Sequence, residues 1–379
     1  METPLIIDTT LRDGEQATGV AFSNAERLRI ALSLEALGIR EMEIGTPSMG
    51  TDEVESINEI ASRCLKARLS CWCRADMEDI RAASACKIQA VYISFPVSDF
   101  LLFAIGHDRP WALRSVGRFV RLAKKLFPLV YIGAPDSSRA HLPFLQMFAQ
   151  AVKDSGANRL RLADTVGILT PGTSLQLVQS VRRAASRLEI EFHAHNDLGL
   201  ATANTLVALE GGAHCVSVTV NGLGERSGNA PLEEVAMALK VGLGIDPGIR
   251  TEGLTALSRQ VAQASGRPLH EGKPVTGSAA FRHESGVHAA ASLKEPCSFE
   301  PYEPRAVGQK SSFAVGKHSG MRLLEYVLGL SKDGLSPEEG KDLLQKVRRE
   351  AVRLKRSLTF EEVERMFHRL KVTGMVDST

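Results

Sequence analysis

"PLIIDTTLRDGEQ", residues 4–16, decides between the two common folds in which strands and helices alternate. Its apolar start is typical of a buried first strand, and this strand leads directly into "TLRDGEQ". A doubly wound open sheet normally has a Gly-rich phosphate-binding loop at this point. Because no such loop follows, the stretch favours a (β/α)8 TIM barrel, with the open sheet as the main alternative.

The rest of the chain repeats this alternation of strand and helix. The helix signals are specific: Ser23 and Glu26 are spaced as a capping box before a helix that stops at Gly38, and Pro171 follows the N-cap Thr170. Eight strands alternating with helices over about 250 residues match the length of a (β/α)8 barrel. The expected strands are 4–10, 40–45, 68–74, 90–95, 129–134, 159–164, 189–195 and 215–222.

The pattern changes after the barrel. We predict a barrel domain over residues 1–265, a Gly/Pro-rich linker subdomain over 266–318 and a helical C-terminal subdomain over 319–379. Two helices are expected in the last part, at 319–330 and 337–370, the second beginning at a capping signal.

Composition and charge argue against some classes of function. Hydrophobic residues at 44% and charged residues at 24% are ordinary globular values, and the net charge of +2 gives no electrostatic reason to expect nucleic acid or an anionic membrane as partner. No apolar run is long enough to cross a membrane. The six scattered cysteines, and a start without the pattern of a signal peptide, favour a cytoplasmic protein with reduced thiols.

Polar side chains gather at the expected carboxyl ends of the strands, where a barrel builds its active site. His193 and His195 are two residues apart, so a continuing strand would point both to one face. Barrel closure brings the first strand, with Arg12 and Asp13, close to them. Two imidazoles and a carboxylate suit a divalent metal, and Asn229 could add an oxygen ligand. A hydrogen-bonded histidine pair without metal is the alternative.

These motifs resemble a known family. "DTTLRDGEQ" (8–16), "HAHND" (193–197) and "NGLGERSGNAPLEE" (221–234) look like the metal-dependent Claisen-condensing barrel enzymes, namely the isopropylmalate, citramalate and homocitrate synthases. The resemblance continues into "FRHESGVHA" (281–289) and "GKHSG" (316–320). Within the family, stretches such as "EIGTPSMG" and "DRPWALR" are most similar to the homocitrate synthases of nitrogen-fixing bacteria.

The resemblance implies condensation of acetyl-CoA with 2-oxoglutarate and water to give homocitrate and CoA, assisted by a divalent metal (Mg, Mn or Zn). Arg12 would stabilise the developing oxyanion, and His288 would serve as base or proton relay in the site of the other subunit of a homodimer, to which the linker subdomain belongs. Thr165 and Gln16 would bind the 2-oxo acid. Arg74 is the candidate partner for its distal carboxylate.

One departure and three alternatives remain. Pro135 stands where the family usually has a glutamate that orients the reacting groups. A shorter 2-oxo acid, as in isopropylmalate or citramalate synthases, could replace 2-oxoglutarate. Cleavage of hydroxymethylglutaryl-CoA is disfavoured because "NGLGERSGN" lacks the cysteine of the related lyases. A non-catalytic metal-binding barrel is the third reading.

Overall fold

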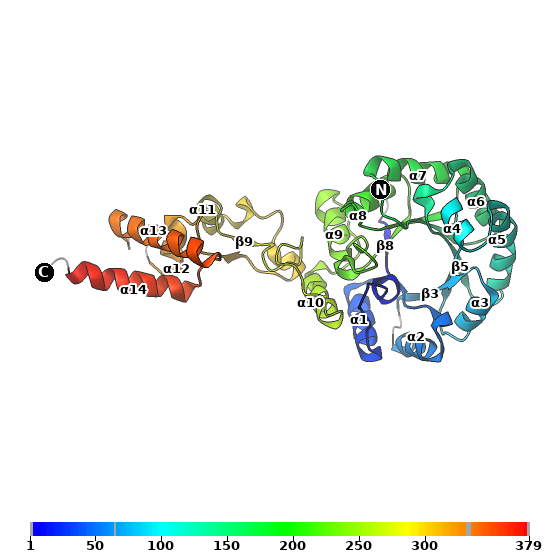
Figure 1. Ribbon diagram of the computed structural model, residues 1–379, viewed down its shortest axis with the longest axis horizontal. Coiled ribbons are helices and arrows are strands. Elements are labelled where there is room, and N and C mark those ends of the chain that lie inside the picture. Colours follow the sequence, from blue (N-terminus) through cyan, green and yellow to red (C-terminus); the bar gives the residue numbers. More distant parts are fainter. Residues whose placement is uncertain (1–2, 64–65, 331–334, 377–379) are drawn as a thin grey trace. The chain divides into compact units, whose positions relative to one another are not determined.

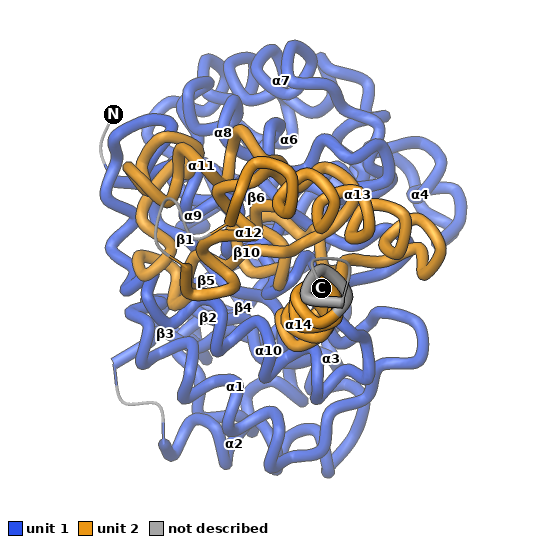
Figure 2. The backbone as a smooth tube through the Cα atoms, turned by 90° about the vertical axis from the view of Figure 1, so that its left-hand side faces the viewer, with its two compact units in different colours: residues 1–269 blue, residues 270–379 orange. Residues whose placement is uncertain are grey.

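The computed structural model describes residues 3–63, 66–330 and 335–376 of the chain. It divides into two compact units, Met1–Leu269 and His270–Thr379 (Figure 2). Within the described residues, no helix is both long and apolar enough to cross a membrane.

The first unit is a closed barrel of eight parallel strands, which confirms the predicted fold class (Figure 1). The strands are paired in chain order, and the ring closes where Leu5 pairs with Cys215. The strands are β1 (Leu5–Asp8), β2 (Glu41–Glu43), β3 (Arg68–Arg74), β4 (Ala90–Ser94), β5 (Leu129–Ala134), β6 (Arg159–Asp164), β7 (Glu189–Ala194) and β8 (Cys215–Val218).

Helices surround this ring of strands (Figure 1). Ser23 forms the predicted capping box with Glu26, and Gly38 ends the same helix in the left-handed conformation with φ 99°. Thr170 caps the helix that begins at Pro171. The helices of this unit are α1 (Asn24–Leu37), α2 (Thr51–Arg63), α3 (Met77–Ala83), α4 (Asp99–Ala104), α5 (Arg109–Ala123), α6 (Leu142–Asp154), α7 (Pro171–Ala184), α8 (Ala201–Glu210), α9 (Leu232–Met237) and α10 (Leu254–Ala264).

Five strands (β1, β2, β4, β7 and β8) end one to four residues earlier than the sequence predicts, and β1 and β8 are the two that matter for the site. β1 stops at Asp8 because the Asp8 carboxylate accepts hydrogen bonds from both the backbone N–H (2.9 Å) and the hydroxyl (3.0 Å) of Thr10. Arg12 and Asp13 therefore lie on a short helical turn, Thr10–Gly14, and not on the strand itself. β8 likewise stops at Val218, and the segment after it forms a loop and a short turn.

The second unit is mainly helical, as predicted. Its elements are β9 (Arg282–His283), α11 (Gly286–Lys294), β10 (Ser312–Phe313), α12 (Met321–Val327), α13 (Pro337–Leu354) and α14 (Phe360–Val376). Its core contains the buried side chains of Ala289, Val315, Leu323, Leu324, Leu343, Val347, Leu358 and Val363.

The prediction of a single helix over 337–370 is wrong, because the chain forms two helices there, α13 and α14. Lys355 adopts a left-handed conformation with φ 52°, and the N–H of Leu358 donates to the carbonyl of Val315 at 2.7 Å. Thr359 and Glu362 then exchange hydrogen bonds as a new capping pair. The hydrogen bond between Leu358 and Val315 ends the helical path after α13, and the T-x-x-E capping signal begins α14.

Candidate active site

Three predicted ligands converge at the carboxyl end of the barrel. The Oδ2 atom of Asp13 lies 3.0 Å from Nε2 of His193 and 4.0 Å from Nε2 of His195. The two Nε2 atoms are 3.3 Å apart. All three side chains are buried, and they form a group that could hold a metal ion.

Barrel closure produces this convergence. His193 lies on β7, in register with Ser217 of β8, and β8 pairs in turn with β1. His195 follows the strand and forms a bridge to Asn229 in the loop after β8. Asp13 and the two histidines, which are 180 or more positions apart in the chain, thus meet at one rim.

The fourth predicted ligand, Asn229, has its amide held in one orientation. Its Nδ2 donates to the carbonyl of Leu223 at 2.9 Å, while its buried Oδ1 has no hydrogen-bond partner in the described part of the chain. Gly228 shapes this loop with φ +82°, since a Cβ there would lie 1.8 Å from the carbonyl oxygen of Gly222. The free acceptor of Asn229 is the atom that an oxygen-binding cation needs.

The charges of Asp13 and His195 suit a divalent cation. Burial alone would raise the pKa of Asp13, but Arg12 and the neighbouring imidazole of His193 hold it well below its usual range. Burial, with the adjacent His193, lowers the pKa of His195 to about 4. The site therefore presents an ionised carboxylate and a neutral imidazole, which are the protonation states of metal ligands. The Oδ2 atom of Asp13 is also buried without a hydrogen bond from any described residue.

Arg12 is fixed beside this group. Its Nη1 lies 2.9 Å from Oδ1 of Asp13, and its Nε donates to Glu43. Its guanidinium carbon is 6.0 Å from the centre of the Trp72 ring. Two carboxylates thus orient a cation next to the candidate metal position, where negative charge on a substrate oxygen could be stabilised.

A cavity of about 180 Å³ lies over these groups. Thr165 lines it, and Gln16 lines it from an exposed position. The lining residues are Arg12, Asp13, Gln16, Trp72, Tyr92, Ser94, Gly133, Ala134, Pro135, Arg161, Ala163, Thr165, His193, His195, Glu225 and Arg226. The structure thus brings six of the predicted site residues to one space.

Pro135 also lines the cavity, but the neighbouring carboxylate is turned away from it. Asp136 is buried in a left-handed conformation with φ 61°, and its side chain binds Ser98 and Arg139. Its backbone N–H donates to the Thr165 hydroxyl at 2.7 Å. Because that oxygen already accepts a bond, the hydroxyl proton of Thr165 is free to be donated to a substrate.

Of the predicted residues in the first unit, Asn229 and Arg74 do not line this cavity, although Asn229 forms a bridge to the lining residue His195. The side chain of Arg74 is 67% exposed and forms a two-pronged ion pair with Asp79, at 2.7 and 3.0 Å. The buried Asp79 carboxylate on α3 draws the guanidinium to the helix side of the loop. His288 belongs to the second unit, on α11, where its ring stacks on Phe299 with centroids 3.9 Å apart.

Sequence reasoning missed a charged network inside the barrel. Its members share alternate positions on three strands, as in "RLRLAD", "EMEIG" and "EIEFHAH", so they point to one face. This alternation of charged and apolar residues is the signal that could have revealed them. The network consists of Arg159, Arg161, Glu41, Glu43 and Glu191.

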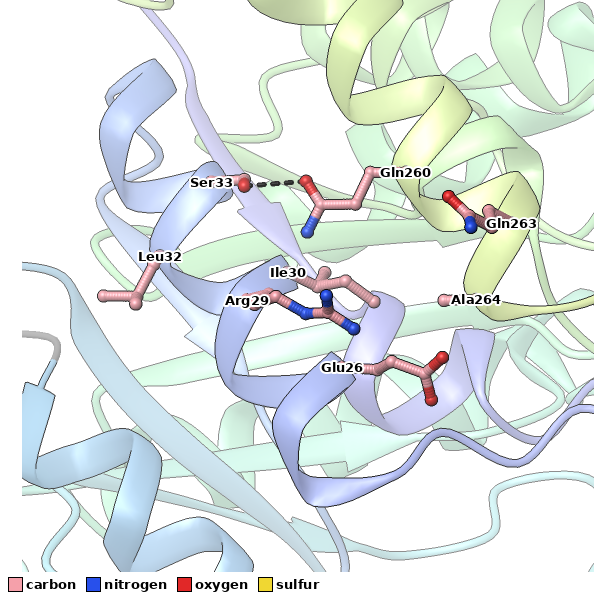
Figure 3. Close-up of a pocket in the computed structure, with 8 residues that line it drawn as sticks. All are labelled: Glu26, Arg29, Ile30, Leu32, Ser33, Gln260, Gln263 and Ala264. Carbon is pink, nitrogen blue, oxygen red and sulfur yellow. Dashed lines mark hydrogen bonds between the residues drawn. The ribbon is translucent and has the colours of Figure 1, made fainter.

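A larger cavity, of about 410 Å³, lies between α1 and α10 on the helical layer of the barrel (Figure 3). The hydroxyl of Ser33 donates to the side-chain oxygen of Gln260 at 2.8 Å across it, and Glu26 and Arg29 also line it. It contains none of the predicted site residues, so size alone does not identify the active site.

The barrel and the cluster at its rim place the chain in the class of (β/α)8 proteins with the ligand set of a metal site. It belongs to the HMGL-like family, which residues 3–261 match; residues 275–355 match the homocitrate synthase post-HMGL domain-like family. The resemblance predicted from the motifs is therefore confirmed for the family.

Relatives in this family cover nearly the whole chain. It is 44% identical to 2-isopropylmalate synthase 2 of Caldanaerobacter subterraneus subsp. tengcongensis, over 97% of this chain and 96% of that protein. It is 43% identical to homocitrate synthase 1 of Nostoc sp., over 96% of each. It is 39% identical to 2-phosphonomethylmalate synthase of Streptomyces rubellomurinus, over 97% and 99%.

Among solved structures, hydroxymethylglutaryl-CoA lyase from Pseudomonas aeruginosa is similar with a TM-score of 0.64 and 20% identity, covering 78% of this chain and 98% of that one. At this identity the likeness concerns the fold alone.

Proposed function

We propose that this chain is a homocitrate synthase, which condenses acetyl-CoA with 2-oxoglutarate and water to give homocitrate and CoA. The observation that carries the proposal is the convergence of Asp13, His193 and His195 with Arg12 in one cavity of a family member. The choice of 2-oxoglutarate is supported by the match of the second unit to the homocitrate synthase post-HMGL domain-like family and by the Nostoc relative.

Asp13, His193 and His195 would hold the metal, with Asn229 as a further oxygen ligand. When bound, a divalent metal supplies Lewis-acid polarisation of a 2-oxo group. The donor set fits such an ion, since Oδ2 of Asp13 and Oδ1 of Asn229 are buried without a hydrogen bond from any described residue, which would otherwise cost free energy.

The other cavity residues have roles that follow from their free donors. Arg12 places its guanidinium where the acceptor oxygen becomes an alkoxide as the new carbon–carbon bond forms. Thr165 donates its hydroxyl proton to the acceptor carboxylate, and Gln16 closes the exposed side. Hydrolysis of the thioester then releases CoA.

We further propose that His288 removes the methyl proton of acetyl-CoA, or relays it, in the site of the second subunit of a homodimer. The segment 266–318 would thus complete the partner's active site. A cytoplasmic location fits the free state of the five described cysteines. A role in nitrogen fixation is suggested only by the resemblance of "EIGTPSMG" and "DRPWALR" to that type of homocitrate synthase.

A second candidate is the same reaction on another 2-oxo acid. The observation that favours it is the similarity to relatives named 2-isopropylmalate synthase and 2-phosphonomethylmalate synthase, at 44% and 39% identity. Cleavage remains disfavoured, because the loop after β8 has no cysteine between Asn221 and Asn229.

The test is release of CoA thiol from acetyl-CoA, followed with a colorimetric thiol reagent, for each of 2-oxoglutarate, pyruvate, 2-oxoisovalerate and phosphonopyruvate. We expect 2-oxoglutarate to have the highest kcat/KM and the product mass to be that of homocitrate. A higher kcat/KM for any other acceptor overturns the choice of substrate. If none of the four acceptors leads to CoA release, in protein loaded with each divalent metal in turn, the proposal that the chain is a condensing enzyme is overturned.

A further inference from the structure

The cavity contains a buried cation to which the proposed function gives no role. Three arginines line the cavity. Arg12 is bound to Asp13, and Arg226 lies at the exposed rim, where Asp197 and the carbonyl of Thr165 occupy its guanidinium. The third, Arg161, comes from β6 inside the barrel and is only 4% exposed.

Arg161 is held by carboxylates along one edge of its guanidinium. Its Nε lies 2.5 Å from Oε1 of Glu191, and its Nη2 lies 2.6 Å from Oε2 of Glu43. Its guanidinium carbon sits 3.7 Å from the centre of the Tyr92 ring. Nη1 has no hydrogen-bond partner among the residues that the structure describes. A guanidinium fixed along one edge keeps the donors of the remaining nitrogen for a ligand.

The position of Arg161 along its strand sets its depth below the candidate metal site. Ala163 of β6 is in register with the metal-site residue His193 of β7. Arg161 is on the same face of β6 but two residues closer to the amino end of the strand. Its position is therefore about 7 Å deeper in the barrel than that of Ala163. Arg161, Ala163 and Thr165 therefore form one line down the cavity wall, from interior to rim.

An acceptor bound by its 2-oxo acid end at the rim extends its remaining carbon chain along this line. In 2-oxoglutarate the second carboxylate is three bonds from the 2-oxo carbon, so it reaches into the interior. We propose that Arg161, through Nη1, binds the distal acidic group of the acceptor and selects acceptors that carry one. The proposal rests on the proposed function and gives to Arg161 the part that the sequence suggested for Arg74.

The same strand offers a matched control. Arg159 is also buried inside the barrel and also pairs with carboxylates, at 2.6 Å from Glu41 and 3.4 Å from Glu191. It does not line the cavity. A purely structural role for these arginines would make the two positions behave alike, whereas a binding role affects only position 161.

The experiment compares Arg161→Lys with Arg159→Lys, using 2-oxoglutarate and phosphonopyruvate as acceptors with a second acidic group and 2-oxobutyrate as one without. Lysine keeps the charge that Glu43 and Glu191 need but loses the fork that presents Nη1. We expect Arg161→Lys to lower kcat/KM for 2-oxoglutarate about 10- to 100-fold, mainly through KM, as for loss of a charged hydrogen bond. We expect 2-oxobutyrate to change less than about twofold, and Arg159→Lys to leave the ratio of the acceptors unchanged.

The outcomes separate the two levels of inference. If the wild type prefers 2-oxobutyrate or 2-oxoisovalerate, the proposed function fails. If the wild type prefers 2-oxoglutarate and Arg161→Lys reduces both kinds of acceptor equally, only the assignment of Arg161 is overturned. If phosphonopyruvate alone shows the loss, the distal group is a phosphonate and the choice of 2-oxoglutarate is wrong.

If Arg161→Lys does not fold, the proposal can still be tested on the wild type. There, 2-oxoglutaramate, which has an amide in place of the distal carboxylate, should have at least a tenfold higher KM than 2-oxoglutarate; equal values overturn the proposal.

Discussion

Glu43 links two arginines of the cavity, Arg12 and Arg161, but does not line the cavity itself. Replacing it therefore tests whether the buried charged network holds these side chains in position. Its side chain is fully buried and bridges Nε of Arg12 and Nη2 of Arg161, the latter at 2.6 Å. We predict that Glu43→Gln weakens both the fold and the activity. Glutamine keeps the shape but removes the charge that holds the two guanidinium groups.

The expected loss of stability follows from what each arginine retains. Breaking a buried ion pair by removing one partner costs about 3–5 kcal/mol. Here Arg12 keeps Asp13 at 2.9 Å and Arg161 keeps Glu191 at 2.5 Å, so the lower end, about 3 kcal/mol, applies. Activity should fall about 10- to 100-fold, as for other residues that orient the groups around a metal site.

The pH dependence has a definite sign. Burial raises the pKa of Glu43, but Arg12 and Arg161 more than offset it and hold the pKa below its ordinary value of 4.5. Its stabilising contribution is therefore complete above pH 4.5 and is lost as the pH falls through the folded-state pKa. The difference in unfolding free energy between wild type and Glu43→Gln should be full at pH 7 and shrink in acid.

Glu41→Gln is the matched control, and urea unfolding with the thiol-release assay is the measurement. Glu41 lies two residues earlier on β2 and bridges Arg159 at 2.6 Å and Arg68 at 2.9 Å, neither of which lines the cavity. It should leave kcat/KM near the wild-type value and cost less stability than Glu43→Gln, because burial holds the pKa of Glu41 above 4.5 whereas the pKa of Glu43 lies below it. The reasoning is refuted if Glu43→Gln loses less than about 1 kcal/mol, or if Glu41→Gln loses as much activity.

Three further predictions concern the metal, the missing acid and the assembly. Replacing both His193 and His195 by alanine should reduce bound divalent metal, measured by elemental analysis, from one per chain to none; stoichiometric metal in that variant would contradict the ligand assignment. Pro135→Glu should raise kcat with little change in KM for 2-oxoglutarate, because it restores an acid–base group of the kind that contributes about 10²–10⁴-fold; a folded, metal-loaded variant with no gain would make Pro135 neutral. Mixing inactive His288→Ala chains with inactive Arg12→Ala chains should restore part of the activity if sites are completed across a dimer; mixed dimers that remain inactive would exclude a cross-subunit role for His288.

The strands of the barrel and the ends of its helices could be predicted from the sequence, because those signals are local. β3, β5 and β6 begin and end where their β-rich runs do, and Ser23 and Thr170 cap the helices that their spacing predicts. Strand periodicity and capping depend on neighbours within a few residues, so they can be read without knowing what packs against them.

Which charged groups meet could not be predicted, because it depends on the folded structure. Arg74 ends β3 ("RLSCWCR") and Arg161 lies in β6 ("RLRLAD"). Asp79 holds Arg74 outside the cavity, whereas Glu43 and Glu191 hold Arg161 inside it. The same holds for the break after Lys355, which depends on a bond to Val315. These choices require the register of the barrel and the partners it aligns, because a side chain's role is set by residues that are distant in the chain and adjacent only after folding.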